Sequence, residues 1–232
     1  MKISDIFMPS NIRCVFCGKE IGGEMSICAD CYATLPFITG RSCNKCGGRV
    51  ILEDVCIDCS REEHRFTKCF SICDYDDKMR GIILAFKQGG KKYIGEALAK
   101  VVYDKYLQLG VDFDIIIPMP IHPSREKERG FNQSIVLCKE LMERTSLVNV
   151  AIVTKVKDTP HQTGLSRENR KTNLIGAFEV VDKTAIKGKR ILVVDDIYTT
   201  GSTMSVLSDV LLKAGAESVY GLCLARGKVF DI

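Results

Sequence analysis

The spacing of cysteines near the N-terminus is the strongest constraint on how this chain can fold. Eight of its twelve cysteines form four CxxC pairs before residue 60, and the stretch CVFCGKEIGGEMSICADC (14–31) is repeated as CNKCGGRVILEDVCIDC (43–59). Each repeat contains a knuckle, a glycine-containing hairpin and a second knuckle. Short CxxC pairs in a chain without an export signal indicate zinc rather than disulfides. A segment this short, with few large apolar residues, would depend on its metals to fold.

Two pairings of these cysteines are compatible with the spacing. One places a zinc ion within each repeat, and the other is interleaved and joins the first knuckle to the third. The internal repeat favours the sequential pairing, which gives two structural Zn²⁺ sites. Their ligands would be Cys14, Cys17, Cys28 and Cys31 in the first site, and Cys43, Cys46, Cys56 and Cys59 in the second.

Zinc also changes what the net charge implies about partners. The formal charge of +4 counts thiols as neutral. Four thiolates and one Zn²⁺ give each site a charge of about −2, so two loaded sites bring the chain close to neutrality. Overall basicity therefore gives no argument for nucleic-acid binding, and only local basic segments remain. The N-terminus lacks the apolar core of a signal peptide, and no apolar run is long enough to span a membrane. We expect a cytoplasmic protein without membrane insertion.

The stretch ILVVDDIYTTGST (191–203) carries the most functional information. Four apolar residues run into two adjacent carboxylates, Asp195 and Asp196, and a hydroxyl- and glycine-rich turn follows. The pattern predicts a buried strand over 191–194, a loop, and an amphipathic helix over 202–214. Loops at the carboxyl ends of such strands bind ligands in open α/β sheets, and a helix N-terminus favours phosphate. The predicted phosphate-binding residues are Thr199, Thr200, Gly201, Ser202 and Thr203.

The two carboxylates could accept hydrogen bonds from sugar hydroxyls or hold a hydrated Mg²⁺. A phosphate cradle beside two such acceptors describes a site for a phosphorylated pentose. The alternative is purely structural: Asp195 and Asp196 would simply end a strand, and Ser202 would be an ordinary N-cap. The stretch resembles the motif with which type I phosphoribosyltransferases bind phosphoribosyl pyrophosphate (PRPP).

The remaining pattern alternates strands with helices, which predicts a doubly wound parallel sheet. Helical faces are expected over 79–86, from about 92 to 109, and over 135–142, and further strands over 114–117, 151–154 and 219–224. The predicted organisation is a small zinc-ribbon module over residues 1–60 and an α/β domain over residues 61–232. We expect the remaining cysteines to be core residues, namely Cys69, Cys73, Cys138 and Cys223. Alternatively, Cys69 and Cys73 could be a third metal pair. His64 is expected to be a solvated linker residue.

Two basic segments accompany the phosphate-binding stretch. PIHPSREKERGFNQS (120–134) follows the strand predicted at 114–117 and is expected to be a loop whose Arg129 and Gly130 face a pyrophosphate leaving group. Residues 155–178 contain Arg167 and Arg170 and have no clear period. They could form a mobile loop that closes over the site and excludes water. Either segment could instead be a solvated surface loop.

Taken together, the motifs PxPxHPxRxxxRGFNQ, DTPxQxxLSRxxRxxN and VDDxxTTGST behind a CxxC module closely resemble the ComF family. That resemblance covers essentially the whole chain. It implies zinc ribbons fused to a type I phosphoribosyltransferase-like domain. It also implies a role in natural transformation, with single-stranded DNA and a competence helicase as partners. By the same resemblance, Asp195 and Asp196 would hold the ribose hydroxyls of PRPP, which binds with Mg²⁺. Two functions remain open: transfer of phosphoribosyl to an unknown acceptor, and a non-catalytic PRPP sensor or DNA- or protein-binding adapter.

Overall fold

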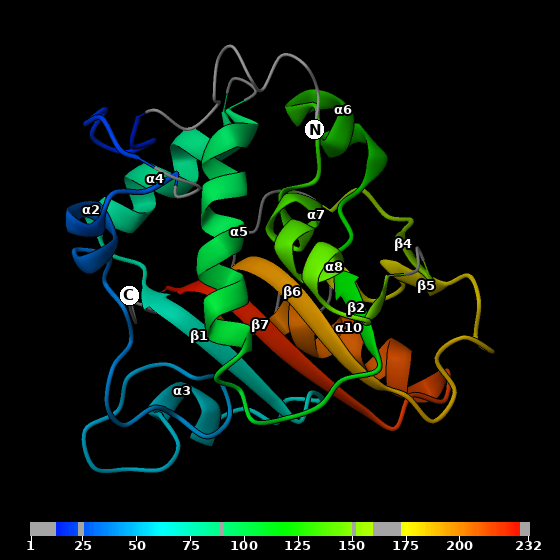
Figure 1. Cartoon of the computed structure of the whole chain (residues 1–232). Coiled ribbons are helices and arrows are strands. Elements are labelled where there is room, and N and C mark those ends of the chain that lie inside the picture. The colour runs from blue at the N-terminus through cyan, green and yellow to red at the C-terminus, as the bar shows by residue number, and fades with distance from the viewer. Residues whose placement is uncertain (1–12, 23–25, 89–90, 150–151, 160–172, 228–232) are drawn as a thin grey trace.

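A parallel β-sheet forms the centre of the molecule (Figure 1). The computed structural model describes residues 13–22, 26–88, 91–149, 152–159 and 173–227. Five strands lie in the order β1-β7-β6-β2-β3, and each pairing is parallel. They are β1 (Lys68–Asp74), β2 (Ile115–Pro118), β3 (Val148–Asn149), β6 (Arg190–Tyr198) and β7 (Ser218–Arg226). The predicted α/β fold with a doubly wound parallel sheet is confirmed.

Helices cover one face of this sheet (Figure 1). They are α4 (Asp77–Lys87), α5 (Lys92–Tyr106), α7 (Gln133–Leu137) and α8 (Lys139–Arg144). Helix α4 buries Met79, Ile83 and Phe86, which recur at the spacing of a single helical face. The helix expected over 135–142 is two short helices that meet at Cys138. Its apolar face is nonetheless buried against the sheet, as the periodicity predicts.

The opposite face is covered by α10 (Ser202–Lys213) and by a separate two-stranded sheet. Helix α10 packs Met204, Leu207 and Leu211 against Ile191 and Val193 of β6. Alternate residues of β6, Leu192 and Val194, belong instead to the core under α5. A strand that is buried on both faces in this way reads as a continuous apolar run, which is why the stretch 191–194 predicted it correctly.

The strand predicted over 151–154 lies elsewhere than expected. It appears as β4 (Val153–Lys155), which pairs antiparallel with β5 (Phe178–Val180) in the two-stranded sheet; Ala151 lies outside the described residues. The fifth place in the parallel sheet is taken by β3, which pairs with β2. A short apolar run does not reveal its pairing partner, so the alternating pattern assigned this strand to the wrong sheet.

The zinc-type cysteines are integrated with the sheet at the edge strand β1. Between the two repeats, Phe37 forms an antiparallel bridge with Cys73. The Ile38 amide donates a 2.8 Å hydrogen bond to the Ile72 carbonyl, and the Asp74 amide donates one of 2.8 Å to the Pro36 carbonyl. The segment between the repeats thus satisfies backbone groups that an edge strand would otherwise expose.

The two repeats lie on opposite faces of the sheet. Cys14 and Cys28 of the first repeat belong to the core under α5, whereas Cys43, Cys46 and Cys59 of the second belong to the core under α10. The second repeat also approaches β1 closely, since the Cys69 amide donates a 2.7 Å hydrogen bond to the Lys45 carbonyl. Both repeats therefore share their cores with the α/β domain. The boundary expected between residues 60 and 61 remains a prediction.

Candidate functional site

The eight CxxC cysteines form two separate clusters. Within each cluster the four sulfur atoms lie within 4.8 Å of one another. The sequential pairing is therefore correct and the interleaved one is wrong. The two sets are the predicted ones: Cys14, Cys17, Cys28 and Cys31 in the first, and Cys43, Cys46, Cys56 and Cys59 in the second.

The geometry of both clusters fits zinc. The Sγ atoms of Cys17 and Cys28 are 3.7 Å apart, and those of Cys46 and Cys56 are also 3.7 Å apart. A tetrahedron with Zn–S bonds of about 2.3 Å has an edge of about 3.8 Å. Backbone amides also point at the sulfurs: the amides of Lys45, Cys46 and Cys56 lie 3.3–3.5 Å from the Sγ of Cys43. Such donors stabilise thiolates that bind a metal. These are two four-cysteine zinc sites.

The predicted phosphate loop lies at the carboxyl end of β6, but it begins later than expected. Asp195 and Asp196 are part of the strand, which continues to Tyr198 because Tyr198 still pairs with Arg226 of β7. The loop itself is Thr199–Gly201, and α10 begins at Ser202. The two carboxylates are therefore fixed by the sheet, whereas the sequence placed them at the point where the strand ends.

Gly201 shapes the turn from the loop into α10. It has a φ of 78° in the left-handed region, and a Cβ added to it would overlap the hydroxyl of Tyr198. Gly201 is the N-cap of α10, so the alternative in which Ser202 caps the helix is wrong. Ser202 and Thr200 are buried and their hydroxyls are 2.8 Å apart. A glycine cap offers no side chain to the helix N-terminus, where a phosphate is favoured.

Asp195 is held from two sides. Its Oδ1 accepts a 2.9 Å hydrogen bond from the Asp196 amide and one of 3.3 Å from the Ser134 hydroxyl. Burial, followed by the charge of Asp196, raises the pKa of Asp195 to about 7. Lys87 and the hydrogen bonds oppose this rise without cancelling it. A ligand that donates hydrogen bonds to Asp195 would stabilise its ionised carboxylate in this environment.

Asp196 forms an ion pair with Lys87, which reaches the site from the last turn of α4. Both side chains are largely buried. Sequence analysis did not single out Lys87 or Ser134. The only available signal for Lys87 was its position at the end of an amphipathic helix, and that signal does not specify a partner far away in the sequence.

Asp195, Thr199, Gly201, Ser202 and Thr203 line one small cavity with Tyr198 and Cys223. The structure therefore brings together one predicted carboxylate and most of the predicted phosphate-binding residues. Thr200 adjoins them through Ser202. The arrangement places hydrogen-bond acceptors next to the N-terminus of a helix, which is the chemistry that a phosphorylated sugar requires.

The segment 120–134 is not the open loop that we expected. Residues Pro123–Arg129 form helix α6, which His122 caps and which ends at Gly130, with a φ of 81°. Asn132 caps α7, and its Nδ2 donates a 3.0 Å hydrogen bond to the Met119 carbonyl. A run of alternating charges without an apolar face predicts a loop, and α6 buries none of its side chains.

Arg129 donates a 2.8 Å hydrogen bond to the side chain of Gln133, at the start of α7. Its place facing a pyrophosphate, like that of Gly130, remains a prediction. Arg167 and Arg170 lie outside the described residues. Residues 155–159 and 173–178 of their segment are described, and in the first of these ranges Asp158 accepts a 2.7 Å hydrogen bond from the Ser124 hydroxyl.

Three further expectations concern single residues. Cys69 and Cys73 are buried in β1, and Cys69 Sγ lies 3.6 Å from the Sγ of Cys223, so both are core residues as predicted. The expectation for His64 was wrong. The His64 side chain is buried, and its ring stacks on that of Phe66 with 4.9 Å between the ring centres. Its Nε2 atom lies 3.4 Å from the Tyr198 hydroxyl oxygen.

With the parallel sheet, the β6–α10 loop and the two zinc clusters established, the chain is defined as a phosphoribosyltransferase-type domain joined to zinc ribbons. Known families match both parts. Residues 3–60 match the double zinc ribbon domain, and residues 132–228 match the phosphoribosyl transferase domain.

The chain belongs to the ComF family. It is 30% identical over 226 residues to competence protein F of Haemophilus influenzae, with 93% of this chain and 97% of the relative covered. It is 29% identical to competence protein ComFC of Bacillus subtilis, with 88% and 85% covered. It is 28% identical to the DNA utilization protein YhgH of Escherichia coli K12, with 92% and 96% covered.

Solved structures with weaker similarity include glutamine PRPP amidotransferase from B. subtilis. That match has 21% identity and a TM-score of 0.37, and it covers 57% of this chain and 25% of the other. A hypoxanthine phosphoribosyltransferase from Staphylococcus aureus matches with 12% identity and a TM-score of 0.34, over 61% and 77% of the two chains. Across the described ranges, the helices are all too short or too polar to cross a bilayer.

Proposed function

We propose that this protein binds PRPP together with Mg²⁺ at the carboxyl end of β6. The single observation that carries the proposal is the arrangement at the carboxyl end of β6, where Asp195 lies beside Thr199, Gly201, Ser202 and Thr203 at the start of α10. The 5-phosphate would bind the loop and the N-terminus of α10, and the ribose hydroxyls would donate hydrogen bonds to Asp195 and Asp196. Mg²⁺ would neutralise charge on the pyrophosphate.

Lys87 gives the site a cation that a ligand can redirect. In the structure its ammonium group neutralises Asp196. Ribose hydroxyls that bind the carboxylate would compete with this ion pair. Lys87 would then be available to the pyrophosphate, where an added cation stabilises the charge that develops as the C1–O bond breaks. Arg129 with Gly130, and Arg167 with Arg170, are further candidates for this role.

The finer proposal is phosphoribosyl transfer to an acceptor that the sequence does not identify. The acceptor would attack C1 while pyrophosphate leaves, and exclusion of water would prevent simple hydrolysis. We propose that such an activity serves DNA uptake during natural transformation, which the names of the relatives, competence protein F and DNA utilization protein, support. The thiol-rich zinc sites are consistent with a cytoplasmic location.

A second function is favoured by the surface of the second zinc ribbon. Ile51, Leu52 and Ile57 expose 82%, 76% and 67% of their area. Apolar side chains gathered on one small loop-rich unit are typical of a contact with another protein. In this second proposal the protein is a non-catalytic adapter that binds PRPP as a signal and contacts a competence helicase or single-stranded DNA.

Calorimetric titration with PRPP and Mg²⁺ tests the first proposal. Wild-type protein should bind, and Asp195→Asn and Asp196→Asn should each weaken binding by about 10- to 100-fold, the range expected for a lost hydrogen bond to a charged group. Asp112→Asn, an exposed carboxylate elsewhere in the chain, is the matched control and should bind as wild type does. Absence of binding by wild-type protein would refute the proposal.

Release of pyrophosphate distinguishes the two functions. The protein is incubated with PRPP, Mg²⁺ and a panel of nucleobases, amines and single-stranded DNA ends, and free pyrophosphate is measured. Release that depends on one acceptor supports transfer. Tight PRPP binding without release across the panel supports the adapter. If the basic segments bind DNA phosphates, affinity for single-stranded DNA should also fall steeply as salt rises.

A further inference from the structure

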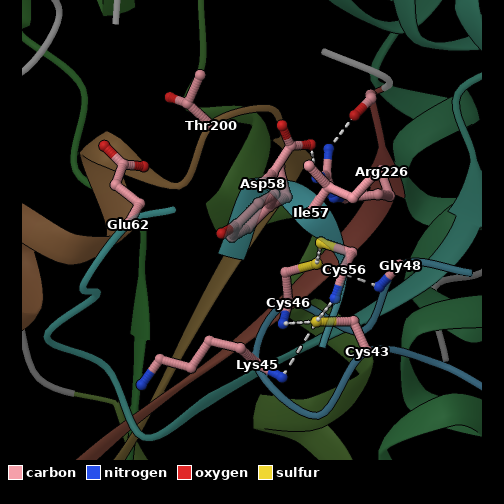
Figure 2. A network of polar contacts seen from close by, with 12 residues as sticks. Cys43, Lys45, Cys46, Gly48, Cys56, Ile57, Asp58, Glu62, Thr200 and Arg226 are labelled. Carbon is pink, nitrogen blue, oxygen red and sulfur yellow. Dashed lines mark hydrogen bonds and ion pairs between the residues drawn. The ribbon is translucent and has the colours of Figure 1, made fainter. Parts of the chain in front are cut away.

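A buried arginine connects the second zinc site to the phosphate loop. Arg226 ends β7 and is 7% exposed. Its Nη2 donates a 3.1 Å hydrogen bond to the Oδ2 of Asp58, and its guanidinium lies 4.9 Å from the ring centre of Tyr198. Figure 2 shows Arg226 and Asp58 facing each other, with Cys43, Cys46 and Cys56 of the second cluster nearby. The arginine thus has a zinc-ribbon contact on one side and a β6 contact on the other.

The contact on the zinc side is direct. Asp58 lies in α3 (Ile57–Ser60), between the ligands Cys56 and Cys59. A Cβ added to Gly48 would lie only 3.2 Å from both Cγ and Nε of Arg226, so the arginine side chain lies against the knuckle backbone. The Gly48 amide in turn points at the Sγ of Cys46, 3.4 Å away. The position of Arg226 therefore depends on the shape that the cluster gives to this knuckle.

The contact on the loop side passes through Tyr198. This residue is 3% exposed, and its hydroxyl closely contacts Gly201, whose φ of 78° shapes the phosphate loop. The amide of Gly227, next to Arg226, donates a 2.8 Å hydrogen bond to the Tyr198 carbonyl. Tyr198 is thus held by the cation over its ring and by the backbone hydrogen bond. His64 and Phe66 contact other parts of the ring. A displaced arginine would therefore remove the contact on one face of the ring that supports Gly201.

The first zinc site has no equivalent connection among the described contacts. Asp30 occupies the position in the first repeat that Asp58 occupies in the second, between two cysteine ligands. Its partner is Lys19, and the two side chains are 78% and 64% exposed. This ion pair stays within the first repeat and lies at the surface. The internal repeat therefore supplies a comparison in which one aspartate is connected to the phosphate loop and the other is not.

We propose that Arg226 is a positioning residue through which the second zinc site, but not the first, holds the phosphate loop in its binding shape. This inference rests on the proposed function, since the ligand that the loop would bind is PRPP. The physical reason is that Arg226 is a buried cation whose carboxylate partner belongs to the zinc ribbon. Arg226 also donates a hydrogen bond to the Gly227 carbonyl and lies beside the Cys46 sulfur. Loss of Asp58 therefore removes its anchor on α3 and lets the guanidinium shift away from Tyr198.

The test compares Asp58→Ala and Arg226→Gln with Asp30→Ala. Each full-length, zinc-loaded variant is titrated with PRPP and Mg²⁺, and its zinc content is measured. We expect Asp58→Ala and Arg226→Gln to weaken binding at least ten-fold while zinc stays near two per chain, and Asp30→Ala to bind within two-fold of wild type. If Arg226→Gln does not fold, the more exposed Asp58→Ala still decides the question. Unchanged affinity in Asp58→Ala, with zinc retained, would overturn the proposal.

A readout without ligand separates this inference from the proposed function. Hydrogen exchange of the peptide that contains residues 198–204 should be at least ten-fold faster in Asp58→Ala than in Asp30→Ala. If wild-type protein does not bind PRPP but this difference is present, the proposed function fails and the coupling stands. If PRPP binds and exchange is equal in the two variants, the coupling fails and the proposed function stands.

Discussion

Replacing Asp195 by asparagine should stabilise the unliganded protein above pH 7. Asparagine has nearly the same shape, and its Oδ1 can still accept the hydrogen bonds from the Asp196 amide and the Ser134 hydroxyl. What the substitution removes is a negative charge that is poorly hydrated and lies next to Asp196. Residues arranged for binding are often unfavourable for stability in this way.

The size of this gain in the free energy of unfolding follows from the raised pKa of Asp195. A change from 3.8 to about 7 corresponds to about 4 kcal/mol if the charge is fully enclosed. Asp195 keeps some contact with solvent, which screens the charge, so we expect about 2 kcal/mol. The sign is fixed by proton binding. Between about pH 4 and pH 7 the folded state holds the proton more tightly than the unfolded state, so this group lowers stability as pH rises through that window.

Urea unfolding at a series of pH values measures the effect. The free energy of unfolding of Asp195→Asn, minus that of wild type, should be near zero at the acidic end and should reach about 2 kcal/mol at pH 8. Any contribution of zinc release to the pH dependence is shared by both proteins and cancels in the difference. Asp196→Asn is the control, and it should not stabilise, because it leaves Lys87 without its ion-pair partner. A difference that is zero or negative at pH 8 would refute the reasoning.

Three further predictions concern metal and backbone. Metal analysis should find close to two zinc ions per chain, and stripping both should unfold the ribbons and lower the melting temperature; a metal content near zero in zinc-replete protein would contradict the assignment. Gly201→Ala should cost about 1–3 kcal/mol in urea unfolding and weaken PRPP binding, because a left-handed alanine would also overlap Tyr198; wild-type affinity would argue against the role of this turn. Gly95→Ala should cost about 1–3 kcal/mol, because its Cβ would overlap Phe86, yet it should leave zinc content unchanged. Equal stability of Gly95→Ala and wild type would show that α4 and α5 can separate freely.

Local pattern predicted the features of this fold that depend on neighbouring residues. The apolar run at 191–194 identified β6, and the cysteine repeat identified both clusters and their pairing. Each of these signals is contained within a few tens of residues. The loop between β6 and α10 was placed within a few residues of its position in the structure for the same reason.

Pairing between distant segments could not be read from the sequence. The ion pair between Lys87 and Asp196 joins the end of helix α4 to strand β6, and only the tertiary fold brings these two elements together. His64 carries no local mark of burial, and it is buried because Phe66 and Tyr198 enclose it. The end of β6 was missed because pairing with β7, rather than apolar character, extends the strand past its two carboxylates.

The pairing of β1 with β7 has a consequence for synthesis of the chain. Strand β1 is among the first parts of the sheet to leave the ribosome, and its partner is the last strand of the sheet. Until β7 emerges, one edge of an apolar strand has no neighbour. The segment that crosses from one zinc ribbon to the other covers the opposite edge from the start. Early zinc capture would therefore protect the growing chain from edge-to-edge aggregation while it waits for its C-terminal strand.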